Sequence, residues 1–411
     1  MTNINGFYTN AVVYSDIISD EAYDQIRQIC NHHAFRNANI RIMPDCHAGT
    51  GCVIGFTAVL AEKKIIPNIV GVDIGCGVMA SVFRTTEPID FHSLDNFIRS
   101  NIPSGMLFRD TSSEYFNTHP DIIADIDSIC RIIKDKDRRE NYVNSLGTLG
   151  GGNHFIEIDR ITDDTYLLAV HTGSRSLGLH ICKHFQKLGT TVDEELRQSI
   201  LEKHKTASTP EEHLAIRNEA DSLPQYDREL ACISEEHYTN YIECMLKAMN
   251  FAYSNRECIS DDIMNYLITH ENAELVERFD TIHNYVNWYN DLHDSIIIRK
   301  GAISAESGQR VSIPLNMRDG IIVGTGKGNE NWNRSAPHGA GRALSRSQAR
   351  RTVSLEDYVD SMKDIATWSV SENTIDESPF AYKVSEDIIR QIEDTVDIDY
   401  IAKTVYNFKA E

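Results

Sequence analysis

Side chains of the types that bind transition metals recur along this chain, most of them inside short glycine-rich segments. They are Asp73 and Cys76 in GVDIGCGV, Asn153 and His154 in GTLGGGNHFIEI, His171 in HTGSRSLG, His283 in TIHNYVNWY and His338 in SAPHGAGRALSR. Thiolate, imidazole and carboxylate groups hold zinc, manganese or iron. Glycine lets the backbone turn sharply and lets a ligand come close. We therefore expect a metal site that is gathered from the whole length of the chain.

Each of these residues has a plainer interpretation when it is taken alone. Asp73 and Cys76 lie three residues apart and could converge on one or two metal ions, but a lone buried cysteine is usually a small apolar residue. His154 could equally be a core histidine with satisfied hydrogen bonds. A sulfur that bridges two cations would hold them as close together as phosphoryl chemistry requires. The joint occurrence of these residues favours the metal site.

His338 stands in PHGAGR, which predicts a loop that enters a helix over RALSRSQARR. Arg342, Arg346 and Arg350 recur every four residues and would form one basic stripe on that helix. Helix N-termini attract anions, so His338 could be a metal ligand, a general base or a nucleophile toward phosphate. The alternative is an exposed basic helix with an incidental histidine. Arg175, just beyond His171, also suits a phosphate oxyanion.

The elements that must position these residues alternate between strands and helices. Strands are predicted at 7–15 and 53–60, and helices at Ser19–Cys30 and over much of 87–140. Segment 40–55 reads as strand, loop and strand, with Asp45 and His47 in the loop. Segment 65–83 repeats that pattern and places Asp73 and Cys76 at a turn between buried strands. His154 would open a strand, and His171 would end one.

Residues 191–280 have mainly helical periodicity, with a good helix start at Thr209-Pro210. We interpret this stretch as a helical insertion that separates His171 from His283 in sequence but not in space. Strands resume over 295–304, 310–315 and 320–326, and the end of the chain reads as helical, with capped starts at Ser354 and Ser385. The simplest interpretation is one α+β domain over residues 1–411, with a strand-rich core and peripheral helices.

Composition narrows the class of protein. The chain carries 41% hydrophobic and 25% charged residues, an ordinary globular balance without an apolar run long enough to span a membrane. Nine cysteines, an odd number without framework spacing, favour a reducing compartment, and the N-terminal residues do not read as a signal peptide. We therefore expect a cytoplasmic location and no membrane partner.

The net charge of −21 argues against non-specific binding of nucleic acid over the whole surface. The charge is uneven, because residues 299–351 hold ten Lys or Arg against three acids, a balance of +7 that leaves −28 for the remainder. An acidic body with one basic segment suits a protein that binds phosphates at a defined place. Chance clustering on a solvated face is the alternative.

With these residues laid out, the chain resembles the family of RtcB-type RNA ligases, in particular a compact bacterial-like branch. The resemblance runs nearly end to end, because MPDCHAGTGCVIGFTA, GVDIGCGV, GTLGGGNHFIEI, HTGSRSLG, HNYV, SAPHGAGRALSR and Lys409 occur in the order of the family. The chain departs from it at Ile313–Gly320, where many members carry Gly-Ser-Met after Ile-Pro. Each motif is short, but their joint occurrence is highly specific.

The resemblance implies an enzyme that uses two manganese ions and GTP. Asp73, Cys76, His154, His171 and His283 would hold the metal, with Cys76 as the bridge. His338 would attack the α-phosphate of GTP and form a histidine–GMP intermediate. GMP would pass to an RNA 3′-phosphate, made by opening a 2′,3′-cyclic phosphate, and a 5′-hydroxyl of RNA would then displace it.

The same resemblance assigns further residues to the nucleotide and the RNA. The expected nucleotide contacts are Asn153, Glu157, Ser335, Gly339, Ala340, Gly341, Arg342, Tyr382 and Lys409, with Lys383 beside Tyr382. Weaker candidates for RNA or phosphate binding are Asp45, His47, Arg175 and Arg346. The natural RNA, the oligomeric state and the need for an activating protein partner stay open.

Two other functions are compatible with these motifs. One is a metal-dependent phosphoesterase or nucleotidyltransferase that acts on something other than RNA ends. The other is a catalytically silent RNA-binding subunit of a repair complex. The full set of metal-binding residues speaks against the silent subunit, which would have no need to keep them.

Overall fold

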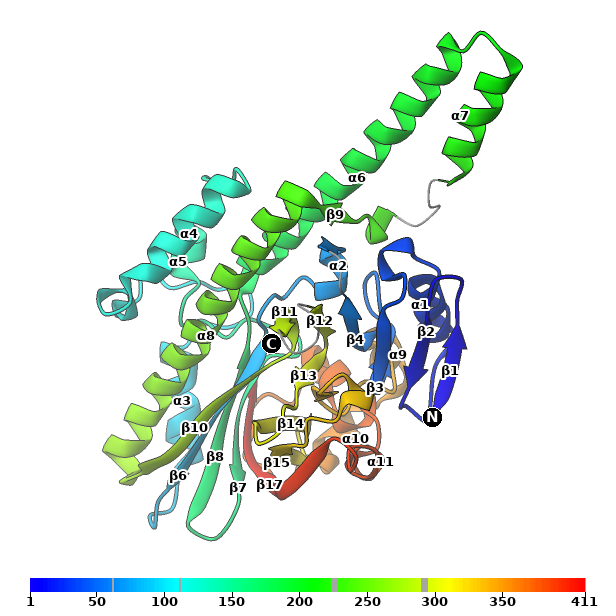
Figure 1. Cartoon of the computed structure of the whole chain (residues 1–411). Coiled ribbons are helices and arrows are strands. Elements are labelled where there is room, and N and C mark those ends of the chain that lie inside the picture. The colour runs from blue at the N-terminus through cyan, green and yellow to red at the C-terminus, as the bar shows by residue number, and fades with distance from the viewer. Residues whose placement is uncertain (61–62, 111, 223–227, 290–294, 411) are drawn as a thin grey trace.

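The computed structural model describes residues 1–60, 63–110, 112–222, 228–289 and 295–410. It is a mixed α+β fold in which two sheets carry the candidate site and helices cover their outer faces (Figure 1). Among the described residues, no helix combines the length and the apolar character that a bilayer span requires. The expected α+β class with a strand-rich core is confirmed.

The first sheet has six strands in the order β1-β2-β3-β4-β12-β11. Only β2 and β3 are parallel. Its strands are β1 Thr2–Asn5, β2 Asn10–Val13, β3 Asn39–His47, β4 Ile54–Leu60, β11 Asn284–Tyr289 and β12 Ser295–Lys300.

The second sheet has seven antiparallel strands in the order β10-β6-β8-β7-β17-β15-β14. It curls until its two edge strands meet, because the backbone N–H of Ser312 in β14 donates to the hydroxyl of Thr281 in β10 at 3.2 Å. Its strands are β6 Gly77–Arg84, β7 Phe155–Arg160, β8 Thr165–Thr172, β10 Glu274–Ile282, β14 Arg310–Asn316, β15 Gly320–Gly326 and β17 Val396–Lys409. Two short pairs join β5 Lys64–Ile65 to β9 Ile233–Ser234 and β13 Ala302–Ser304 to β16 Ser335–Pro337.

Two long helices, α6 and α8, pack against each other behind the sheets, and α7 folds back on the far end of α6 as a projecting hairpin (Figure 1). The helices are α1 Asp20–Cys30, α2 Pro67–Val70, α3 Phe91–Asn101, α4 Pro120–Ile132, α5 Arg139–Asn144, α6 Arg175–Thr206, α7 Pro210–Ser222, α8 Glu235–Glu271, α9 Arg346–Thr352, α10 Leu355–Ser361 and α11 Ser385–Gln391. The cap expected at Ser354 is confirmed, since its side chain accepts from the first turn of α10, and Ser19 caps α1 in the same way.

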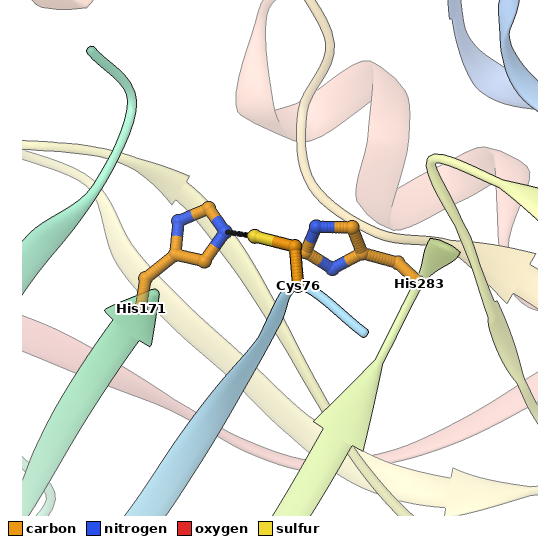
Figure 2. A group of neighbouring side chains, drawn as sticks. All are labelled: Cys76, His171 and His283. Carbon is orange, nitrogen blue, oxygen red and sulfur yellow. Dashed lines mark hydrogen bonds between the residues drawn. The ribbon is translucent and has the colours of Figure 1, made fainter. Parts of the chain in front are cut away.

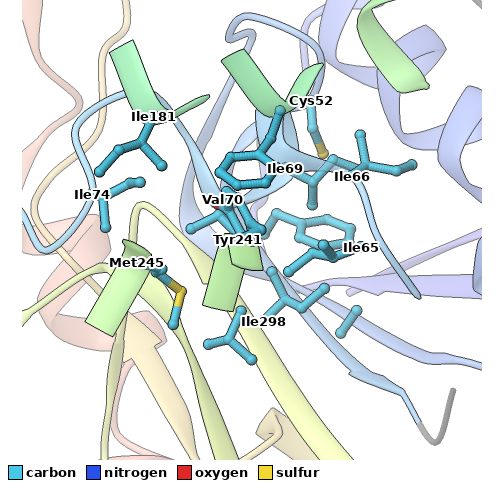
Figure 3. Packing of buried hydrophobic residues seen from close by; sticks show 14 of the residues in the cluster. Cys52, Ile65, Ile66, Ile69, Val70, Ile74, Ile181, Tyr241, Met245 and Ile298 are labelled. Atoms are coloured by element: carbon cyan, nitrogen blue, oxygen red, sulfur yellow. The ribbon is translucent and has the colours of Figure 1, made fainter. Parts of the chain in front are cut away.

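The largest apolar cluster joins the first sheet to the helices near the candidate site. Figure 3 shows Ile69 and Val70 of α2 packed among Ile181 of α6, Tyr241 of α8 and Ile298 of β12, all of them buried. This packing fixes α2 and the turn that follows it against the long helices. The same turn carries Asp73 and Cys76.

Several predicted elements are wrong in detail near the site. The strand expected at 7–15 is shorter and covers only Asn10–Val13. Asp45 and His47 lie in β3 rather than in a loop, because the strand continues over a bulge and His47 still pairs with Ile54. The first of the two strands expected in 65–83 is instead helix α2, which Pro67 begins at its first position.

The other corrections concern the second half of the chain. The helical segment begins at Arg175 and ends at Glu271, because residues 274–282 pair with β6 as β10, and part of it (223–227) lies outside the described residues. The chain ends in the long strand β17 rather than in a helix. Ser385 is the first residue of α11 and does not cap it, since its hydroxyl donates to Asp319.

The basic helix expected after His338 begins only at Arg346. Ser345 and Gln348 form a capping box that starts α9 there. Arg342 lies before it and pairs with Tyr382 in an isolated bridge. The three arginines therefore do not form one stripe on one helix, and His338 does not stand at a helix N-terminus.

Candidate metal and nucleotide site

The expected metal-binding residues gather where four neighbouring strands, β10, β6, β8 and β7, begin or end on the same side of the sheet. Antiparallel pairing places the start of β6, the end of β8, the start of β7 and the end of β10 at the same edge, with Val78 opposite His171, which is itself opposite Phe155. Cys76 directly precedes β6, and His154 directly precedes β7. His283 lies between β10 and β11, where the chain passes from one sheet to the other. The prediction that His171 and His283 are close in space is confirmed, since their ring centroids are 5.3 Å apart.

Cys76 lies at the centre of this group. Its Sγ is 3.3 Å from Nε2 of His171 and 3.5 Å from Nε2 of His154. Figure 2 shows Cys76 between His171 and His283, as expected from a strand order in which β6 lies between β8 and β10. Two sets of three side chains have donor atoms within 4.8 Å of one another, Cys76-His171-His283 and Asp73-Cys76-His154, and Cys76 belongs to both.

Asp73 and His154 complete the second set. The carboxylate of Asp73 is 2.9 Å from Nε2 of His154, and Nη1 of Arg175 donates to Nδ1 of the same ring at 3.0 Å. Gly173 makes room for this carboxylate, because a Cβ there would lie 2.2 Å from Oδ1 of Asp73. Arg175, expected at phosphate, instead lies behind His154 and is buried enough that its pKa is lowered.

These donors fit a metal ion by their chemistry. Burial, together with the charge of Asp73, raises the pKa of Cys76 well above its usual range, and burial lowers the pKa of His171 and of His283 well below theirs. Oδ1 of Asp73 and Nδ1 of His171 are buried and have no hydrogen-bond partner among the residues that the structure describes. A thiol, three imidazoles and a carboxylate that face one another suit a divalent cation, whose charge would ionise the thiol.

Arg256 of α8 fixes the backbone around these donors from beneath. It is fully buried, and its Nη1 donates to the carbonyls of Gly75 and Thr172, next to Cys76 and His171. Its other nitrogens hold both carboxylate oxygens of Asp280 in β10 at 2.7 Å. One guanidinium thus ties together three of the four strand ends.

His338 lies beside the donors and is oriented by a buried carboxylate. Its ring centroid is 4.7 Å from that of His283. Its Nδ1 is 2.6 Å from Oδ2 of Asp45, a residue with no exposed surface, so Nε2 is the nitrogen left for chemistry. Asp45 was expected at RNA or phosphate, but its burial beneath His338 keeps it from either. His47, the other candidate from β3, has its Nδ1 2.8 Å from the backbone carbonyl of Asp45, and burial lowers its pKa to about 4.

A cavity of about 790 Å³ opens over the donors, a size that suits a small-molecule ligand. It is bordered by Asp73, Cys76, His171, His283 and His338, and by most of the expected nucleotide contacts, namely Asn153, Glu157, Gly339, Ala340, Gly341, Arg342, Tyr382 and Lys409. Ser335 is the exception among those contacts. It is fully buried, and its hydroxyl accepts from Arg299 and donates to the carbonyl of Asn333.

Two acidic residues that were not predicted from the sequence bind the side chains along one wall of the cavity. Glu377, at the end of the 3₁₀ helix η6 Glu372–Glu377, contacts Arg342, Arg346, Tyr382 and Lys409. Asp376 beside it contacts Arg346 and Arg350. The segment SENTIDESP has no glycine and no metal-type motif, so nothing in the sequence distinguished these acids from surface ones. Arg256 was missed for the same reason, since it lies within an ordinary helical pattern.

Fold and site together define an α+β protein with a candidate metal centre at the floor of a nucleotide-sized cavity. A family model described as "tRNA-splicing ligase RtcB" matches residues 25–132 and 128–410. The chain therefore belongs to the RtcB family.

Named relatives match over most of their own length. The chain is 29% identical to the RNA-splicing ligase RtcB of Escherichia coli K12 over 388 residues, which cover 89% of each chain. It is 27% identical to the tRNA-splicing ligase RtcB of Methanococcus maripaludis, over 93% of this chain and 89% of that protein. The tRNA-splicing ligase RtcB of Nanoarchaeum equitans is also 27% identical, over 85% of this chain.

Proposed function

We propose that this protein is an RNA ligase that joins a 3′-phosphate or 2′,3′-cyclic phosphate end to a 5′-hydroxyl end, using manganese and GTP. The observation that carries the proposal is the placement of His338. Its free Nε2 stands beside His283, at the edge of a large cavity, while Asp45 holds Nδ1. Membership in the RtcB family and the names of the relatives supply the RNA substrate.

His338 is the proposed nucleophile. A carboxylate at Nδ1 keeps the proton on that nitrogen and leaves the lone pair on Nε2, as in other carboxylate-oriented histidines. Nε2 attacks the α-phosphorus of GTP, the N–P bond forms and pyrophosphate leaves. The RNA 3′-phosphate then takes GMP from His338, and the 5′-hydroxyl of the second RNA end displaces GMP. Attachment of GMP is needed because a phosphate monoester lacks a good leaving group.

The cavity offers a donor and an acceptor that suit guanine. Lys409 carries only donors, and Glu157 when ionised carries only acceptors. Both border the cavity, and they lie on the paired strands β17 and β7. Guanine presents one acceptor and two donors along its pairing edge, whereas adenine presents a donor where guanine has the acceptor. The pair therefore favours GTP over ATP.

Asp73, Cys76, His154, His171 and His283 would hold two manganese ions, with Cys76 common to both sets. Bound metal would supply charge that stabilises the phosphoryl oxygens during transfer. His338, Asn153 and Arg346 border the same space and would orient the phosphates. We further propose that residues 1–411 act as one catalytic domain in the cytoplasm. The same site could work with an activating protein partner.

The proposal is tested by incubating the purified protein with manganese and α-phosphate-labelled GTP, with labelled ATP in parallel. We expect label from GTP that survives denaturation, is lost in acid and maps to His338. The variant His338→Ala should bind metal normally and take up no label. Persistent labelling of that variant would place the nucleophile elsewhere.

A phosphoesterase or nucleotidyltransferase that acts on another substrate is the alternative. It would account for the metal-type donors but not for a histidine whose Nδ1 is held by a buried carboxylate beside a nucleotide-sized cavity. Intact GTP binding without any label, under every metal tested, would favour that alternative.

A further inference from the structure

Glu377 is the centre of a buried network behind the cavity. Its Oε2 accepts from Nζ of Lys409 at 2.7 Å and from the hydroxyl of Tyr382 at 2.6 Å. Its Oε1 lies 3.2 Å from Nη1 of Arg342 and 2.6 Å from Nη1 of Arg346. Only 3% of its side chain is exposed. One carboxylate therefore receives four donors from separate parts of the chain.

Those four donors border the cavity, whereas Glu377 does not. Lys409 ends β17, Tyr382 follows a 3₁₀ turn, and Arg342 and Arg346 flank the start of α9. The guanidinium of Arg342 also lies over the ring of Tyr382, and the ammonium of Lys409 lies over that of Phe155. The side chain of Lys409 is 4% exposed, so its position is fixed by these contacts rather than by solvent.

The charges of the network suit an anionic ligand. Glu377 and Asp376 contribute two negative charges against four positive ones, from Lys409 and from Arg342, Arg346 and Arg350, which leaves an excess of two. Burial opposes ionisation of Glu377, but Lys409 and Arg346 outweigh it and hold its pKa at about 2. Burial and the charge of Glu377 raise the pKa of Tyr382, so that its hydroxyl stays a neutral donor.

We propose that Glu377 is the positioning residue that sets base selectivity, by holding Lys409 and Tyr382 in place to receive a purine whose edge accepts a hydrogen bond. This inference rests on the proposed function. Without Glu377, the ammonium of Lys409 would lack a counter-charge in a buried place, and it would turn away toward another acceptor or solvent. The donor that distinguishes the two purines would then be lost.

The test compares Glu377→Gln with wild type in covalent labelling by GTP and by ATP, with manganese present. Glutamine keeps the size of the side chain but removes its charge and offers one acceptor instead of two. We expect the KM for GTP to rise about 10- to 100-fold with a smaller change in kcat, and the preference for GTP over ATP to fall by a similar factor. Asp376→Asn is the matched control, because Asp376 is equally buried and binds Arg346 but contacts neither Lys409 nor Tyr382; it should keep the preference for GTP.

A second comparison, between a double and a single variant, tests the proposal even if Glu377→Gln folds poorly. The double variant Glu377→Gln/Lys409→Met removes both buried charges, and its preference for GTP over ATP should equal that of Lys409→Met alone, because Glu377 sets the selectivity through Lys409. A full additional loss of that preference in the double variant would overturn the proposal, as would an unchanged KM and selectivity in Glu377→Gln. Absence of label from the wild type would instead reject the proposed function, and calorimetric binding of GTP and ATP to the same variants would then test Glu377 by itself.

Discussion

His338 and Asp45 lie 293 residues apart in the chain, and a single carboxylate oxygen of Asp45 holds both the backbone N–H and the ring of His338. The backbone bond is 3.1 Å long and the ring bond 2.6 Å. Gly341 makes this approach possible, because its φ is +75° and a Cβ there would lie 2.1 Å from the carbonyl oxygen of Asp45. The second glycine of PHGAGR is thus required by β3, on which Asp45 stands.

Replacement of Asp45 by asparagine should reduce transfer of GMP to His338 by about 100-fold or more. The amide can turn its NH₂ toward Nδ1, which would move the ring proton to Nε2 and remove the attacking lone pair. The measurement is the single-turnover rate of label incorporation at saturating GTP. Metal content and thermal stability should stay close to wild type, since Asp45 contacts none of the metal-type donors. A rate within threefold of wild type would contradict the orienting role.

Replacement of Cys76 by alanine should sharply reduce manganese binding, because the two sets of donors share this sulfur. We expect less than half of the wild-type metal content after equilibrium dialysis, together with loss of labelling. Cys232→Ala is a suitable control, since Cys232 belongs to neither set. Unchanged metal stoichiometry in Cys76→Ala would reject a bridging sulfur.

Much of this site could be predicted from local sequence. Aspartate, cysteine and histidine residues flanked by glycine indicate metal-binding side chains from the local sequence alone. The structure brings five of them together as expected, namely Asp73, Cys76, His154, His171 and His283. The strands β6, β7 and β8 were predicted from their apolar residues, whereas β10, which leads to His283, lies in a stretch that was expected to be helical. Such signals are local, so they are visible without knowledge of the fold.

What could not be predicted depends on contacts between distant parts of the chain. β17 alternates in VDIDYIAKTVYNFK, but its strand pairing with β7 and β15 is decided by tertiary contacts that no local pattern contains. Asp45 was expected in a loop because a bulge cannot be distinguished from a loop by composition. Glu377 and Arg256 have ordinary neighbours in sequence, and their roles follow only from the side chains that surround them.

Asp159 offers a test of pH dependence away from the metal-type donors. It lies two residues beyond Glu157 on the same face of β7, and both side chains are buried, opposite Thr404 and Asn407 of β17. Burial raises the pKa of Glu157, and burial with the charge of Glu157 raises the pKa of Asp159. Because the pKa values of this pair are higher in the folded than in the unfolded state, the pair favours folding at acid pH. This contribution to stability is lost as the pH rises.

Asp159→Asn should therefore stabilise the protein at pH 8 by about 1 to 3 kcal/mol and have little effect near pH 5. The free energy of unfolding in urea at the two pH values is the measurement. Asp163→Asn is the control, because Asp163 is exposed in the turn between β7 and β8 and should be neutral at both. A loss of stability at pH 8 in Asp159→Asn would mean that the buried carboxylate is stabilised by a partner such as a cation.

The last prediction concerns Arg256, which contacts no metal-type donor through its side chain but holds the backbone beside Cys76 and His171. Arg256→Met keeps an unbranched apolar stem but removes the guanidinium and leaves Asp280 without its partner, which should cost about 3 to 5 kcal/mol of folding free energy. Because three of the strand ends lose a shared anchor, manganese affinity should fall about 10- to 100-fold in the fraction that stays folded.

The neighbouring pair Arg278–Asp261 provides the comparison for Arg256. Its N–O distance of 2.6 Å is as short, but Asp261 is 47% exposed and Arg278 21%, so solvent screens the interaction. Arg278→Met should cost less than about 1 kcal/mol and leave metal affinity unchanged. Titration of both variants with manganese, at a temperature where each is folded by circular dichroism, separates the two effects. If Arg256→Met binds manganese as tightly as Arg278→Met, the guanidinium supports the fold alone and the strand ends hold their positions without it.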